Sequence, residues 1–158
     1  MNGAIKNNME YNGDELEFLK HGKLNNLIDL YEYIQPNCSR AIQETAVIRY
    51  LGIIISRNGY FSDHMNMITS KVKQRIGWIF RTFQTNTAQF GKFMWKSYIQ
   101  GLLDYGSQIW APVQITQIQK LELLQKSFTN RLYALQNKNY WEKLKIHKIY
   151  SVGRRFQR

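Results

Sequence analysis

The sequence predicts an α+β protein, in which a small antiparallel β region precedes a helical bundle. Up to about residue 56, apolar residues alternate with polar ones or form a short β-branched run, which is typical of strands. Beyond that point apolar residues recur at spacings of three and four, which is typical of amphipathic helices. The 158 residues are enough for one modest domain or two small ones, and we place a boundary between residues 1–56 and residues 57–158.

Three segments of the first region are predicted strands. Residues 16–20 and 31–34 alternate apolar and polar side chains, and a Pro-Asn turn pair at 36–37 follows the second of them. Residues 47–55 form the strongest predicted strand. Their nearly continuous β-branched run is typical of a strand buried on both faces. An Arg-Asn-Gly turn at 57–59 is expected to close it.

The second region is expected to contain four helices. The first has Ser62 as its N-cap, the second runs from a Thr87 cap to about Tyr105, the third follows a Thr116 cap, and the fourth covers 140–145. The second helix is apolar on most sides, which is typical of a central bundle helix. The apolar stripe of the first helix consists of Met65, Ile68, Val72, Ile76, Ile79 and Phe83. The stripe of the third consists of Leu121, Leu124, Phe128, Leu132 and Leu135.

Charge is distributed unevenly between the two regions. The whole chain has 22 basic and 11 acidic residues, a formal net charge of +11. Residues 1–56 hold five basic and seven acidic side chains, which gives −2, whereas residues 57–158 hold 17 basic and four acidic ones, which gives +13. All four tryptophans also lie in the second region. This pattern favours a polyanionic partner, and nucleic acid is the first candidate.

Several classes of protein and of site lack support in the sequence. No apolar run reaches the roughly 18 residues of a membrane span, and the N-terminus has no signal pattern. We therefore expect an intracellular protein, nuclear or cytoplasmic, that is neither secreted nor bound to a membrane. The single cysteine, Cys38, excludes an internal disulfide framework. The histidines have no ligand spacing, there is no glycine-rich phosphate loop, and the aspartates are not clustered for two-metal phosphoryl transfer. We expect no catalytic residue and no metal site in this chain.

Basic side chains interleaved with aromatic ones are the main candidates for a binding surface. On the first predicted helix, Lys71, Arg75, Trp78 and Arg81 lie away from the apolar stripe, where they match a phosphate backbone. Two interpretations of Trp78 stay open: stacking on a base or sugar, and packing against a neighbouring helix. Each single lysine also fits an ordinary solvated surface. The candidate nucleic-acid-binding residues are Lys71, Lys73, Arg75, Trp78, Arg81, Lys92, Lys96, Lys120, Lys126 and Arg131.

Short motifs follow one another along the chain in a characteristic order. They lie at residues 12–17, 49–54, 71–74, 77–83, 93–96, 104–108, 110–112, 121–129 and 140–144, and at the two arginines 154 and 155. In their order and spacing, these motifs resemble the C-terminal portion of the reverse transcriptases, or RNA-directed DNA polymerases, of non-LTR retrotransposons. The resemblance covers roughly residues 9–158.

The resemblance implies a role for each region. Residues 1–56 are similar to the end of the palm, and Tyr50, Leu51 and Gly52 are similar to its primer grip, a hairpin that holds the primer end. Residues 57–158 are similar to the thumb, a helical bundle that clasps the template–primer duplex. The implied partner is thus an RNA or DNA template–primer duplex, contacted mainly at phosphate and sugar.

Two departures from the family pattern concern catalysis. The aromatic-x-Asp-Asp motif that binds the metal ions is not in the sequence, and Glu15 occupies the position of a lysine that protonates the leaving pyrophosphate. The resemblance therefore implies a fragment that is inactive by itself and belongs with upstream palm and fingers. Mg²⁺ is expected only for the full-length parent enzyme. Three alternatives stay open: a non-catalytic nucleic-acid-binding helical module, a protein-interaction module, and a decayed element copy without function.

Overall fold

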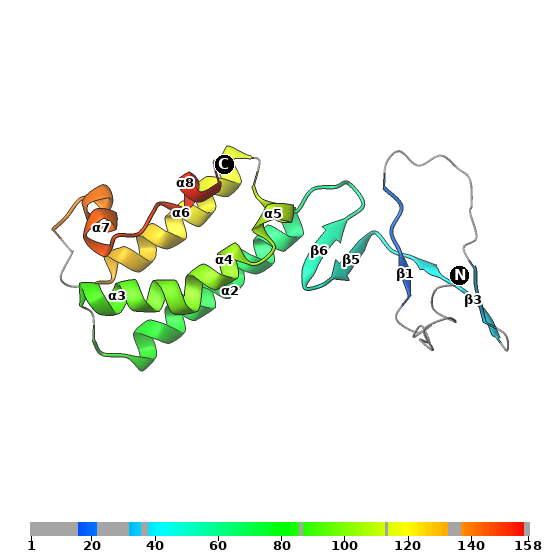
Figure 1. Ribbon diagram of the computed structural model, residues 1–158, viewed down its shortest axis with the longest axis horizontal. Coiled ribbons are helices and arrows are strands. Elements are labelled where there is room, and N and C mark those ends of the chain that lie inside the picture. The colour runs from blue at the N-terminus through cyan, green and yellow to red at the C-terminus, as the bar shows by residue number, and fades with distance from the viewer. Residues whose placement is uncertain are drawn as a thin grey trace. The chain divides into compact units, whose positions relative to one another are not determined.

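The computed structural model describes residues 16–21, 32–35, 38–85, 87–112, 114–132 and 137–156. The chain divides into two compact units, Met1–Tyr60 and Phe61–Arg158. Short strands occur in the first unit and helices in the second (Figure 1). The described residues thus have a mixed α+β structure, as predicted at this coarse level.

The described part of the first unit contains three two-stranded pairings. They are β1 (Glu17–Phe18) with β4 (Gln43–Glu44) in parallel, β2 (Glu32–Gln35) with β3 (Cys38–Ala41) antiparallel, and β5 (Val47–Tyr50) with β6 (Ile53–Ser56) antiparallel. In the last pair, Val47 lies opposite Ser56 and Tyr50 opposite Ile53. The turn predicted at 36–37 lies outside the described residues. The turn at 57–59 is confirmed, because the N–H of Gly59 donates to the carbonyl of Ser56 at 2.9 Å.

The prediction of one strand over 47–55 is wrong, because β5 and β6 form a hairpin. Leu51 and Gly52 have positive φ angles of 46° and 80°, which is the pattern of a type I′ turn. Gly52 reaches such an angle without a steric penalty, so the β-branched run folds back and its two halves pair with each other. Burial on both faces is also not found, since Val47 is 44% exposed while Ile53 is buried.

The second unit consists of helices joined by short connections. They are α2 (Ser62–Thr82), α3 (Ala88–Met94), the π-helix η2 (Trp95–Gln100), α4 (Gly101–Asp104), α5 (Ser107–Trp110), α6 (Ile115–Asn130), α7 (Tyr140–His147) and α8 (Val152–Phe156). The segments α3, η2 and α4 follow one another directly and correspond to the predicted second helix. No helix among the described residues combines the length and apolarity that crossing a membrane requires.

The predicted N-caps are right at one of three positions. The Thr87 hydroxyl accepts a hydrogen bond from the N–H of Phe90 at 3.3 Å, as a cap should. Ser62 and Thr116 are wrong, because α2 already includes Ser62 and α6 begins at Ile115, one residue before Thr116. The predicted fourth helix corresponds to α7, which begins directly after Asn139. Asn139 is its N-cap and forms a capping box with Glu142.

The core of the second unit lies where α2, η2 and α6 meet. The stripe of α2 is buried from Met65 to Ile79, and the ring of Phe128 on α6 lies 5.3 Å from that of Trp95 on η2. Leu135 of the predicted α6 stripe lies outside the described residues. The second predicted helix, which corresponds to the segment from α3 to α4, was expected to be central in the bundle. This prediction is wrong, because the segment buries Trp95 and Ile99 on one side and leaves Phe93 61% exposed on another.

Candidate nucleic-acid interface

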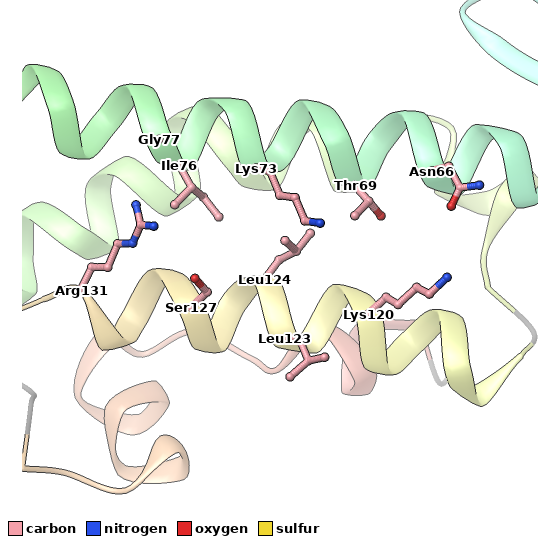
Figure 2. A pocket seen from close by; sticks show the side chains of 10 residues that line it. All are labelled: Asn66, Thr69, Lys73, Ile76, Gly77, Lys120, Leu123, Leu124, Ser127 and Arg131. Atoms are coloured by element: carbon pink, nitrogen blue, oxygen red, sulfur yellow. The ribbon is translucent and has the colours of Figure 1, made fainter.

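A groove of about 640 Å³ lies between α2 and α6 (Figure 2). The helices run along it in the same direction, so that Asn66 lies near Lys120 at one end and Gly77 near Arg131 at the other. Its lining residues are Asn66, Thr69, Lys73, Ile76 and Gly77 from α2, Lys120, Leu123, Leu124 and Ser127 from α6, and Arg131 directly after α6. None of these lining residues is acidic. The groove is therefore a cationic channel with a partly apolar floor.

The three cations of the groove come from both of its walls. Lys73 extends from α2 and Lys120 from α6 into the space between the helices (Figure 2). The guanidinium of Arg131 lies 5.6 Å from the ring centroid of Phe80, a cation–π contact that orients it. All three are exposed to solvent. A polyanion in the groove would meet positive charge on both sides, which favours a phosphate backbone.

The candidate binding residues of the first helix lie on more than one surface of α2. Lys73 lines the groove, whereas Arg75 and Trp78 lie against η2. The guanidinium of Arg75 donates a hydrogen bond to the carbonyl of Tyr98, and Arg81 Nε donates to the carbonyl of Gly77 at 3.2 Å. Two residues along a helix correspond to about 200° of rotation, so Lys71 and Lys73 cannot serve the same surface.

The structure agrees with the packing interpretation of Trp78, and the stacking interpretation stays a prediction. Its ring packs against Tyr98 and Phe83, at centroid distances of 5.7 Å and 5.8 Å. The side chain nevertheless keeps 43% of its surface exposed. Trp78 is thus a packed residue with one accessible side.

The other candidate cations lie on separate surfaces. Lys126 is exposed on α6 but does not line the groove, and Lys92 lies on α3 near the buried His147. Lys96 lines a second pocket of about 750 Å³, in which Arg155 forms an ion pair with Asp104 at 2.8 Å. Of the predicted cations, the groove brings together only Lys73, Lys120 and Arg131.

Three polar residues of the groove were missed by the sequence argument. Asn66 and Thr69 on α2 and Ser127 on α6 offer amide and hydroxyl groups beside the cations. The signal was present, because Asn66, Thr69, Lys73 and Gly77 follow one another at spacings of three and four. Such a polar stripe is the helical counterpart of the apolar one and marks a shared face.

Two histidines are buried in the helical unit, and burial lowers the pKa of each. Burial lowers the pKa of His64 below its usual 6.5, and the positive charge of Lys71 lowers it further. Burial likewise lowers the pKa of His147. The backbone of Ala88 opposes this shift, and the positive charge of Lys92 adds to it. The ring of His64 lies 5.3 Å from that of Trp110, within the packed interior. Among the described residues, no group of three or more histidine, cysteine or acidic side chains is placed to hold a metal ion.

The residues that resemble a primer grip occupy the β5–β6 hairpin. Tyr50 ends β5, and Leu51 and Gly52 form the turn. Tyr50 is 64% and Leu51 is 71% exposed, so both present apolar surface at the tip. The role of these residues stays a prediction. Glu15, at the position of the family's lysine, lies outside the described residues.

Known proteins do not identify the family of this chain. Comparison with protein-family models, with curated proteins and with solved structures found no match.

Proposed function

We propose that the chain is the C-terminal portion of a non-LTR retrotransposon reverse transcriptase, and that its helical unit holds a template–primer duplex in the groove between α2 and α6. The observation that carries the proposal is the placement of Lys73, Lys120 and Arg131 along a groove without acidic lining residues. The motif resemblance supplies the family, and the groove supplies a surface that suits the thumb of such an enzyme.

The dimensions of the groove suit a short stretch of backbone. From residue 120 to residue 131, α6 rises about 16 Å, at 1.5 Å per residue. A duplex carries one phosphate per 3.4 Å of axis on each strand, so about five nucleotides of one strand pass along this length. Asn66, Thr69 and Ser127 suit phosphate and sugar oxygens, which carry no sequence information. The interface thus fits recognition of backbone and helix shape.

The described residues do not suit the metal chemistry of polymerisation. That chemistry needs clustered carboxylates to hold two divalent ions, and the described acidic residues form no such group. We therefore propose a duplex-holding role without catalysis for this chain, and we assign Mg²⁺ only to a full-length parent enzyme. Template-dependent nucleotide incorporation by the purified chain would contradict this assignment.

A salt titration of duplex binding tests the proposed role of the groove. The wild-type chain and the triple variant Lys73→Ala, Lys120→Ala, Arg131→Ala are titrated with a labelled RNA–DNA hybrid, and anisotropy is measured at several salt concentrations. A plot of log affinity against log salt has a negative slope, and each lost phosphate contact reduces its magnitude by about 0.9. At 0.1 M salt, each lost contact corresponds to an affinity about eightfold weaker. The triple variant should lose between two and three units of slope.

A matched triple variant controls for net charge. Lys138, Lys145 and Arg154 are exposed and lie outside the groove lining, so their replacement by alanine removes the same charge elsewhere. This variant should keep most of the wild-type affinity and slope. Equal losses in the two triple variants, or an unchanged groove variant, would reject the groove as the duplex site.

A second candidate function, a protein-interaction bundle, is favoured by exposed apolar side chains. Phe93, Ile115, Leu123 and Trp141 are each more than 60% exposed. This function predicts self-association that nucleic acid does not change. Sedimentation of the chain with and without the hybrid distinguishes it from the first proposal.

A further inference from the structure

A second surface of the helical unit joins exposed aromatic rings to cations, on the side of α2 that contacts η2. The rings of Trp78 and Tyr98 lie 5.7 Å apart and are tilted by 42°. Trp78 is 43% and Tyr98 is 37% exposed. We call Trp78, Tyr98 and Arg75 the aromatic platform. None of its members lines the groove between α2 and α6.

The platform is held in place by the π-helix. Single π-helical turns inside α-helices are rare and frequently occur at functional sites. Here Tyr98 belongs to the π-helical segment, whose Trp95 and Ile99 are buried in the core. The guanidinium of Arg75 donates to the carbonyl of Tyr98, which ties the segment to α2. The rings are therefore anchored from behind while their outer sides remain accessible.

Positive charge borders the platform. Lys71 lies one helical turn before Arg75 on the same side of α2 and is exposed. The acidic residues Asp104 and Glu122 are engaged elsewhere, Asp104 with Arg155 and Glu122 with the N–H of Gly153. Asp63 lies 15 residues before Trp78 on α2, about 22 Å along the helix axis. The platform thus combines stacking surface with the positive charges of Lys71 and Arg75.

We propose that the aromatic platform binds a single-stranded segment of nucleic acid, with bases stacked on Trp78 and Tyr98 and phosphates beside Lys71 and Arg75. Base–aromatic stacking needs an unpaired base face, which a duplex covers with its neighbours. Because the rings are tilted by 42°, one flat base cannot stack on both, and two successive bases of a flexible strand fit better. The inference rests on the proposed function only in taking nucleic acid as the partner.

Binding of a single-stranded oligonucleotide of about ten nucleotides, within the usual site sizes, tests the platform. Trp78→Leu and Tyr98→Leu keep an apolar side chain in the core contact but remove the aromatic face. Each should weaken single-strand binding about 5- to 100-fold, as loss of one stacked base does. Duplex binding should stay within about twofold of wild type, and Trp78→Phe should retain most of the single-strand affinity.

Trp141→Leu is the matched control. Trp141 is 61% exposed. Its ring packs against that of the neighbouring Tyr140 within α7, with the ring centroids 5.2 Å apart. Its replacement should leave single-strand binding unchanged. Wild-type protein irradiated with an oligonucleotide that contains 5-iodouracil should give adducts on Trp78 or Tyr98, so the test does not depend on the folding of any variant.

The outcomes separate the platform from the duplex groove. Loss of single-strand binding in Trp78→Leu, with adducts at the platform, supports the platform even if the groove variant still binds duplex. Wild-type single-strand affinity in both leucine variants overturns the platform. Absence of single-strand binding, or adducts only at other residues such as Trp141, overturns it also, whatever the duplex titration shows.

Discussion

Gln125 on α6 accepts a hydrogen bond from the backbone N–H of Val152 at 3.0 Å, although 27 positions separate the two residues. The amide nitrogen of Gln125 donates to the carbonyl of Tyr150, also at 3.0 Å, and Glu122 one turn earlier accepts from the N–H of Gly153 at 2.7 Å. Gln125 is 1% exposed, and its bond to Val152 is buried. One turn of α6 therefore fixes the backbone that enters α8.

Gln125→Leu should destabilise the helical unit. Leucine fills a similar volume but leaves the buried N–H of Val152 without a partner, at about 1–3 kcal/mol, and the part-buried carbonyl of Tyr150 without one, at about 1 kcal/mol. We expect the free energy of unfolding in urea to fall by roughly 2–4 kcal/mol. Gln119→Leu, an exposed site on the same helix, should change it by less than about 0.5 kcal/mol. Similar small effects at both positions would contradict a structural role for the Gln125 amide.

Replacement by alanine should have opposite effects on stability at Gly91 in α3 and at Gly101 in α4. A Cβ at Gly91 would lie 2.4 Å from Leu132 Cδ1 and 3.0 Å from His147 Cε1, so Gly91→Ala overpacks the interface and should cost about 1–3 kcal/mol. A Cβ at Gly101 meets nothing within 4 Å, and Gly101→Ala should stabilise the helix by about 0.5–1 kcal/mol. Melting temperatures of the two variants provide the measurement. A stabilised Gly91→Ala variant would mean that α7 packs elsewhere.

Acidification below about pH 6.5 should weaken the helical unit. The pKa values of His64 and His147 are lowered in the folded state by burial, so the unfolded chain binds protons first as the pH falls. The free energy of unfolding should therefore be constant above the unfolded pKa and decrease from about pH 6.5 downward. Urea unfolding at pH values from about 7.5 to 5 measures this slope. In the double variant His64→Gln, His147→Gln, the free energy of unfolding should depend less steeply on pH. An unchanged pH dependence would assign the effect to other groups.

Leu51→Asn should stabilise the β5–β6 hairpin. Leu51 has a φ of 46°, a region that β- and γ-branched residues seldom occupy, whereas Asn followed by Gly is the preferred pair for a type I′ turn. We expect a gain of a few tenths to about 1 kcal/mol, detected as slower amide hydrogen exchange in β5 and β6. Gly52→Val, which places a branched side chain at a φ of 80°, should have the opposite effect. Faster exchange in Leu51→Asn would show that the leucine side chain stabilises the turn.

The sequence predicted the helices better than it predicted the surfaces that they form. Spacings of three and four located α2, α6 and the segment from α3 to α4, because burial of one stripe is a local property of a helix. The N-caps at Ser62 and Thr116 were wrong, since a favourable residue near a helix start need not occupy the capping position.

The groove required tertiary information. Lys71 and Lys73 are nearly adjacent in sequence, and only the position of α6 shows that Lys73 belongs to the groove. The π-helical turn has no residue signature that distinguishes it from the α-helix around it, so the placement of Tyr98 beside Trp78 could not be read from spacing. The β5–β6 hairpin was concealed by β-branched residues on both sides of Gly52.

A polyanion bound in the cationic groove would couple its binding to folding. The walls of the groove come from two helices, so a polyanion that bridges Lys73 and Lys120 joins α2 to α6 and adds its binding free energy to the free energy of unfolding. Without ligand, the like charges of the groove repel each other, and added salt relieves this strain by screening. Salt should thus act in opposite directions on the two states: it should stabilise the empty bundle and loosen a bundle that holds a polyanion.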